Sequence, residues 1–187
     1  MSKIRLTASV CAAVALLALN PAQAGPAGHG KHTDLGGHEG HGAHAHTFSL
    51  SVGEPGDPAD ARRVKRVVMN DNTYAPKSIT VSKGETVHFL IFNKGEFVHE
   101  FNIGTAKMHR AHQAEMLSMM ESGALEADRI VHEKMGAMKH DDPNSVLLEP
   151  GQKGEIVWKF SEAGEIQFAC NVPGHYEDGM HGRLRIR

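Results

Sequence analysis

The sequence predicts an all-β protein, a two-sheet antiparallel sandwich with one helical insertion. Two observations support this fold class. From residue 62 to the C-terminus, seven or eight short segments rich in β-branched and aromatic residues are separated by turn residues. One stretch, residues 105–140, instead has the frequent Ala, Met, Glu and Lys of helices. Many short strands with one helical excursion are typical of a sandwich.

The first 24 residues have the pattern of a secretory signal peptide. Two basic residues, Lys3 and Arg5, precede an apolar run from Ala8 to Leu19, and an Ala-x-Ala cleavage site ends at Ala24. The apolar run is shorter than the roughly 20 residues that a membrane-spanning helix needs. We therefore expect an exported, periplasmic protein with no membrane anchor in the mature chain.

The composition of the mature chain limits the functions that it can have. Removing 24 of the 187 residues leaves 163 residues, one cysteine, and 18 basic against 22 acidic side chains, a formal charge of −4. This length suits one domain with appendages, and the mild acidity gives no support for nucleic-acid binding. One cysteine in an oxidising compartment cannot form an internal disulfide. Cys170 is therefore an exposed thiol open to oxidation, a buried side chain with no chemical role, or a metal ligand. Its histidine and methionine neighbours favour a metal ligand.

Residues 25–61 are predicted to be a His-rich disordered leader and a linker. Residues 25–47 are mostly Gly, His and Ala, a composition that cannot bury a core and that is typical of weak metal binding or of a flexible polar leader. Residues 48–52 alternate and allow a short edge strand, which Pro55 would end. Six of the 14 histidines fall in the leader: His29, His32, His38, His41, His44 and His46.

The folded domain is predicted to span residues 62–187, with residues 84–85 and 94–95 among its turns. Residues 74–76 are interpreted as a further turn. The expected strands are residues 64–69, 78–81, 86–93, 98–103, 145–148, 154–160, 165–171 and 183–187. The expected core side chains are Val87, Phe89, Trp158, Phe160 and Phe168.

The insert, residues 105–140, is predicted to contain two helices, residues 106–121 and 124–138. Both stretches are rich in good helix formers, and Ser122-Gly123 is the expected break between them. Six of the nine methionines lie in the insert. The insert therefore differs from the strands in chemistry as well as in structure.

The loop from Cys170 to Met180 carries the clearest chemical pattern. Cys170, His175 and Met180 follow one another at five-residue intervals beside the C-terminal strand, and His99 lies in an earlier predicted strand. A soft thiolate and thioether mixed with imidazoles suits both oxidation states of copper. A lone buried cysteine and a core methionine are the alternative, but their joint occurrence with a histidine at this spacing argues against it.

These residues make the chain resemble the cupredoxins, the family of plastocyanin, azurin, auracyanin and rusticyanin. The resemblance covers residues 62–187 apart from the insert, and it lies in residues 74–87 and in the Cys-x4-His-x4-Met loop. It implies a Greek-key two-sheet sandwich with one type 1 copper ion. The copper ligands that it implies are the imidazoles of His99 and His175, the thiolate of Cys170 and the axial thioether of Met180.

Two positions depart from the family's pattern. Val98 precedes His99 where azurins have a glycine whose carbonyl approaches the metal, so a fifth ligand is not expected. Glu100 follows His99 where several family members have an asparagine that braces the cysteine loop. The hydrogen bonding around the ligands, and with it the redox potential, therefore depends on what Glu100 does.

The insert is predicted to hold a second, softer copper site. Residues three and four apart share a helix face, and thioethers prefer Cu(I). The alternative is a hydrophobic helix face that packs on the sheet, against which the interleaved histidines argue. The candidate ligands are Met108, His109, His112, Met116, Met119, Met120, His132, Met135, Met138 and His140.

The leader and the insert also extend the resemblance, to the periplasmic copper-tolerance cupredoxins called CopI. We therefore expect a protein that binds or oxidises periplasmic copper, with copper ions and a periplasmic redox partner or copper-handling protein as partners. The alternative is a diffusible periplasmic electron carrier, which needs one copper alone. An enzyme such as a nitrite reductase or multicopper oxidase is not expected beyond a Cu(I)-oxidising activity, because the resemblance implies that those enzymes need more domains. The excess of His and Met favours tolerance.

Overall fold

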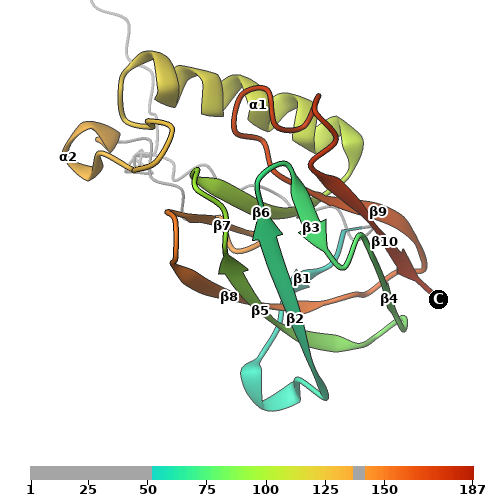
Figure 1. Cartoon of the computed structure of the whole chain (residues 1–187). Helices are drawn as coiled ribbons and strands as arrows, with labels where there is room; N and C mark the ends of the chain where they lie inside the picture. The colour runs from blue at the N-terminus through green and yellow to red at the C-terminus, as the bar shows by residue number, and fades with distance from the viewer. Residues whose placement is uncertain (1–51, 137–141) are drawn as a thin grey trace, which may run out of the picture. The chain divides into compact units, whose positions relative to one another are not determined.

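The computed structural model describes residues 52–136 and 142–187, which fall in one compact unit. They form two five-stranded sheets packed as a sandwich, with a long helix beside one of them (Figure 1). The strand order is β1-β8-β5-β2-β3 in the first sheet and β4-β10-β9-β6-β7 in the second. The predicted all-β sandwich with a helical insertion is confirmed.

Eight of the ten strands coincide with predicted ones, with shifts of one or two residues at some ends, whereas β1 and β3 were not predicted. The first sheet contains β1 (Glu54–Pro55), β2 (Arg63–Asn70), β3 (Thr73–Ala75), β5 (Thr86–Asn93) and β8 (Lys153–Lys159). The second contains β4 (Ser78–Val81), β6 (His99–Gly104), β7 (Ser145–Leu148), β9 (Gly164–Ala169) and β10 (His181–Ile186). The helices are the 3-10 turn η1 (Pro58–Asp60), α1 (Ala106–Glu121) and α2 (His132–Met135).

The sandwich was predicted to be antiparallel, and this is wrong for two strand pairs. In the first sheet β2 runs parallel to β5, and in the second β4 runs parallel to β10. The chain leaves the first sheet after β3, contributes β4 to the second sheet, and returns to the first as β5. A strand that returns through such a crossover can run in the same direction as its neighbour, whereas a tight hairpin cannot produce this arrangement.

Aromatic side chains from both sheets form the core. Phe89 of β5 faces Phe101 of β6 with ring centroids 5.7 Å apart, and Phe101 lies 5.4 Å from Phe168 of β9. Tyr74 of β3 packs edge-on against Phe168 at 5.1 Å. The five core side chains predicted from the sequence are all fully buried. This packing holds β6 and β9, the strands next to the predicted metal ligands, in a rigid setting.

The segment before residue 62, interpreted as linker, contributes to the first sheet. Val52 is fully buried, and its carbonyl accepts a hydrogen bond of 2.8 Å from Trp158 Nε1. Glu54 and Pro55 pair with the end of β8. The buried indole N–H needs an acceptor, and this short segment supplies it. The predicted leader and the rest of residues 48–52 lie outside the described residues.

The helical insert is confirmed in its first half and wrong in its second. Helix α1 has the predicted bounds, and Gly123, with φ +71°, lies just beyond its C-terminal end. Within residues 124–136, one turn, α2, is helical instead of a second long helix. Buried Leu125 and the Ala127 carbonyl, which accepts from Val98 N at 2.7 Å, tie this segment to the sheet, so tertiary packing overrides helix propensity. In the described part of the chain, no helix is long and apolar enough to cross a membrane.

Candidate metal centre

Two neighbouring strands and one loop bring the predicted copper ligands together. His99 is the first residue of β6, Cys170 follows the last residue of β9, and His175 and Met180 lie in the loop before β10. Strand β6 runs antiparallel to β9, with Asn102 opposite the last residue of β9. The start of β6 therefore lies beside the chain that follows β9, which places His99 next to the loop.

Backbone hydrogen bonds close the loop on itself. Cys170 N donates to the Met180 carbonyl at 3.0 Å, and Met180 N donates to the His175 carbonyl at 2.9 Å. Gly174 and Gly179 have φ of +88° and +94°, a region that other residues rarely adopt. Cys170 and Met180 are fully buried, whereas His175 is half-buried. The loop thus holds one thiol, one imidazole and one thioether at a fixed spacing near the surface.

Three donor atoms converge at this point. His99 Nδ1 lies 3.2 Å from His175 Nδ1, and Cys170 Sγ lies 4.0 Å and 3.4 Å from these two nitrogens. His99, Cys170 and His175 form the one group of three or more His, Cys, Asp or Glu residues in the described ranges whose donor atoms all lie within 4.8 Å of one another. Nitrogen and sulfur donors bound at about 2.0–2.3 Å in a trigonal plane lie about 3.5–3.8 Å apart, so the cluster fits one metal ion.

Asp71, which the sequence analysis did not single out, orients His99. Its Oδ1 lies 2.9 Å from His99 Nε2, so the N–H of that nitrogen donates to the carboxylate and Nδ1 keeps its lone pair toward the cluster. The backbone N–H of Glu96 donates to the same carboxylate. A Cβ at Gly95 would lie 2.2 Å from Asp71 Oδ1 and 2.8 Å from His99 Nε2, so glycine is required there for this contact.

The surroundings favour neutral imidazoles and a protonated thiol in the metal-free protein. Burial lowers the pKa of His99, and the hydrogen bond to Asp71 and the charge of that carboxylate oppose this shift without reversing it. Burial and the neighbouring His99 lower the pKa of His175. Burial raises the pKa of the Cys170 thiol to about 12. Both histidines therefore have the form that binds metal at neutral pH, whereas the cysteine must lose a proton to bind.

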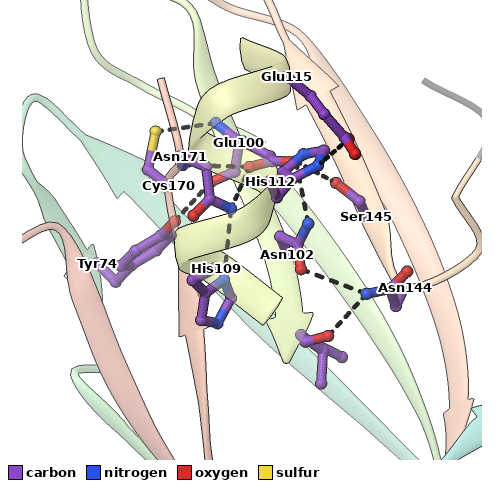
Figure 2. Close-up of polar contacts among 11 residues, drawn as sticks. Tyr74, Glu100, Asn102, His109, His112, Glu115, Asn144, Ser145, Cys170 and Asn171 are labelled. Atoms are coloured by element: carbon purple, nitrogen blue, oxygen red, sulfur yellow. Dashed lines mark hydrogen bonds and ion pairs between the residues drawn. The ribbon is translucent and has the colours of Figure 1, made fainter. Parts of the chain in front are cut away.

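Glu100, the residue after His99, braces the loop that begins at Cys170. Its Oε2 accepts from the backbone N–H of Asn171 at 3.1 Å and from the Asn171 side-chain amide at 2.7 Å (Figure 2). Its own backbone N–H donates to Cys170 Sγ at 3.3 Å. The Tyr74 hydroxyl donates to the Glu100 carbonyl. One residue thus holds both the sulfur and the residue that follows it.

The Glu100 carboxylate is fully buried and is surrounded by donors from four elements of the fold. Its Oε1 accepts from Ser145 Oγ at 2.6 Å, Asn102 Nδ2 at 3.2 Å and His112 Nε2 at 2.9 Å (Figure 2). Donors on both oxygens favour the charged form of a carboxylate. A buried charge of this kind needs an opposite charge near it.

His112 of α1 supplies that opposite charge. Its Nε2 faces Glu100, and its Nδ1 lies 2.9 Å from Glu115 Oε2 one turn further along the helix. Burial alone would lower the pKa of His112, but the hydrogen bonds and charges of Glu100 and Glu115 raise it to about 9. His112 is therefore an imidazolium at neutral pH, and α1 is joined to the cysteine loop through a buried ion pair.

The candidate ligands of the second copper site in the insert differ in how buried they are. His109, His112, Met116 and Met119 are buried, and the two methionines belong to the hydrophobic core. The other described candidates are more accessible: Met108 and Met135 pack partly against the core, His132 is exposed, and Met120 is 36% exposed. Met138 and His140 lie outside the described residues. Burial lowers the pKa of His109 to about 4, so this side chain is neutral beside Asn171.

The comparison with known families agrees with this fold and with copper as the metal. The family model described as copper binding proteins, plastocyanin/azurin family, matches residues 63–187. The chain therefore belongs to the plastocyanin/azurin family of copper-binding proteins, and copper is its cofactor. Within residues 52–136 and 142–187, the His/Cys/His cluster could hold such a metal.

Among curated relatives, the chain is 44% identical over 158 residues to the copper-resistant cuproprotein CopI of Pseudomonas aeruginosa, covering 78% of this chain and 85% of that protein. It is 43% identical to CopI of Rubrivivax gelatinosus, covering 78% and 79%. Among solved structures, auracyanin B matches with a TM-score of 0.54 at 17% identity, covering 72% of this chain and 96% of that one. Auracyanin of Roseiflexus castenholzii matches with a TM-score of 0.50 at 20% identity, covering 68% and 98%. The auracyanins show the shared fold.

The protonated thiol predicts that copper affinity rises with pH. Because Cys170 has a pKa of about 12 in the metal-free protein and both histidines are already neutral, binding should release one proton and affinity should rise about tenfold per unit from pH 7 to pH 9. Anaerobic competition against a Cu(I) chelator, corrected for the chelator's own pH dependence, measures this slope. Cys170→Ala should lose it, and a flat wild-type profile would contradict the account.

The Asp71 contact predicts a loss of copper affinity when it is removed. Asp71→Ala should weaken binding about 10- to 100-fold, because His99 loses the partner that fixes its tautomer and ring orientation. Gly95→Ala should act in the same direction by displacing the carboxylate. The control is Asp60→Ala, which removes an exposed carboxylate of η1, outside the ligand loop. Equal affinities for Asp71→Ala and the control would show that the contact does not orient the ligand.

Proposed function

We propose that His99 Nδ1, Cys170 Sγ and His175 Nδ1 hold one copper ion in a type 1 site, with Met180 as the axial ligand. The convergence of the three donor atoms within 4.8 Å is the observation that carries this proposal. Bound copper supplies one-electron exchange between Cu(I) and Cu(II), for which this mixture of soft and borderline donors is suited. Met180 is buried at the end of the loop, where its backbone pairs with Cys170.

The chain's own residues prepare the site for that exchange. Asp71 fixes one imidazole, the Glu100 N–H donates to the sulfur, and burial keeps water from Cys170 and Met180. A site held by rigid strands and a closed loop changes little in geometry between oxidation states. His175 is half-buried, whereas the other three proposed ligands are buried. Electrons should therefore pass between copper and a redox partner through the His175 imidazole.

The function that we propose is periplasmic copper tolerance. Three features support it: the relatives at 44% and 43% identity are named copper-resistant cuproproteins, the first 24 residues resemble a signal peptide, and the leader and insert contain more His and Met than one site needs. The protein would bind excess copper. It would also oxidise Cu(I) if one electron passes from a captured Cu(I) ion to the type 1 site and on to a periplasmic acceptor.

A diffusible electron carrier is the second candidate function. The observation that favours it is Phe97, which is 43% exposed and whose ring centroid lies 6.5 Å from that of His175. An exposed aromatic ring beside a half-buried ligand offers a redox partner an apolar contact close to the metal. A carrier has no use for further copper sites, so copper stoichiometry and growth on copper distinguish the two functions.

We also propose a second copper site in the insert, with fewer ligands than the ten predicted from the sequence, because several of those are buried. The structure contains a cavity of about 150 Å³ lined by Met108, Glu115 and Asp142 among others, with His112 at its wall. Met108 would supply a soft thioether there, and the carboxylates would supply charge. Met116 and Met119 lie in the core, where their packing role is already clear.

The tolerance proposal predicts that deletion of this gene makes the source organism sensitive to copper. The wild-type gene should restore growth on copper, whereas Cys170→Ala should not, because the variant lacks the thiolate of the site. Growth at graded copper concentrations measures both, and equal protein levels in the periplasmic fraction serve as the control. A deletion strain that grows normally on copper but respires slowly would favour the electron carrier instead.

The insert proposal predicts more than one Cu(I) per chain in a protein that lacks residues 25–47. Replacing Met108 and Met120 by Leu should lower the stoichiometry toward one and leave the type 1 copper bound, because Leu keeps the volume but not the sulfur. Anaerobic titration with a chromophoric chelator gives the count. The matched control is Met116→Leu with Met119→Leu, since both side chains are buried. If the Met108 and Met120 variant binds as many copper ions per chain as the wild type, these methionines of the insert serve packing and do not bind copper.

A further inference from the structure

The insert helix reaches the metal centre through one buried ion pair. His112 lies on α1, and its Nε2 lies 2.9 Å from Glu100 Oε1. Glu100 is the residue after a predicted copper ligand, His99, and is fully buried. The His112 side chain is 10% exposed, so water screens this pair weakly. The pair is therefore stronger than an ion pair on the protein surface and more sensitive to the loss of either member.

Two routes lead from Glu100 to the sulfur of Cys170. The carboxylate accepts both the backbone N–H and the side-chain amide of Asn171, the next residue after the cysteine. The backbone N–H of Glu100 donates to Cys170 Sγ at 3.3 Å. A displacement of the Glu100 side chain therefore moves Asn171 and strains the hydrogen bond to the sulfur, and hydrogen bonds to a thiolate tune the potential of copper sites.

We propose that His112 is a positioning residue of the copper site, which acts through Glu100 on Asn171 and the Cys170 loop. The proposal rests on Cys170 being a copper ligand, as set out above. The helical insert is then a structural part of the metal centre as well as a candidate for binding further copper. Glu115 holds the other ring nitrogen of His112 from the solvent side, which keeps the imidazolium turned toward Glu100.

The geometry favours this role over simple packing of the helix. Met116 and Met119, on the same helix, already supply buried apolar contacts to the core. His112 instead directs a charged N–H at a carboxylate that four further hydrogen bonds hold in place. A residue needed for packing alone would act through volume, whereas His112 acts through charge. Substitutions that keep the volume and change the charge therefore separate the two roles.

The test compares four proteins: wild type, His112→Gln, Glu100→Gln and the double variant. Glutamine at residue 112 keeps a side-chain N–H and removes the charge. We expect His112→Gln to shift the thiolate-to-Cu(II) absorption band and the reduction potential. In the metal-free protein we expect it to raise the alkylation rate of Cys170 roughly three- to tenfold, because a charge-assisted hydrogen bond that protects the loop becomes a neutral one. Glu121→Gln is the matched control, since it removes the charge of an exposed residue at the C-terminal end of the same helix, and it should leave the three quantities unchanged.

The double variant decides whether His112 acts through Glu100. If it does, His112→Gln should add nothing to the band, the potential or the alkylation rate in the Glu100→Gln background. Equal effects of His112→Gln in both backgrounds would overturn the proposal, as would a folded His112→Gln protein with wild-type values. If His112→Gln alone does not fold, Glu100→Gln and the double variant are compared directly, and any difference between them contradicts the proposal. A wild type without the absorption band would refute Cys170 as a ligand, whereas the metal-free alkylation rates would still test the role of His112.

Discussion

The pairing of β6 with β9 is the constraint on which the metal centre depends. It places His99, the first residue of β6, close to Cys170, the first residue after β9, although the two are far apart in the sequence. The aromatic core between the two sheets fixes both strands. The short loop then adds His175 and Met180 at little entropic cost, because its ends are already held by neighbouring strands.

A second constraint follows from Glu100, a buried carboxylate next to the proposed ligand His99. Removing one partner of a buried ion pair typically costs about 3–5 kcal/mol, so the fold must keep an opposite charge near Glu100. Helix α1 provides it as His112. The helical insert and the loop from Cys170 to Met180 are therefore linked through the Glu100 carboxylate.

The chemistry of the centre was predictable from the sequence because three candidate ligands are close together in it. The five-residue spacing from Cys170 to His175 to Met180 is a local signal, and α1 follows local helix propensity. The role of Asp71 was not predictable, because its contact with His99 depends on a turn that crosses from the end of β2. The parallel strand pairs were missed for a related reason, since strand direction depends on the crossover through β4. The second predicted helix failed because Leu125 and its neighbours pack on the sheet.

In the proposed type 1 site, Cys170 provides a thiolate ligand to Cu(II) in a trigonal plane with His99 and His175. The most direct measurement is the visible absorption spectrum of the Cu(II)-loaded mature protein, compared with that of Cys170→Ala. We expect an intense thiolate-to-Cu(II) charge-transfer band in the wild type and none in the variant. A colourless Cu(II)-loaded wild type, or a band of equal strength in Cys170→Ala, would contradict it.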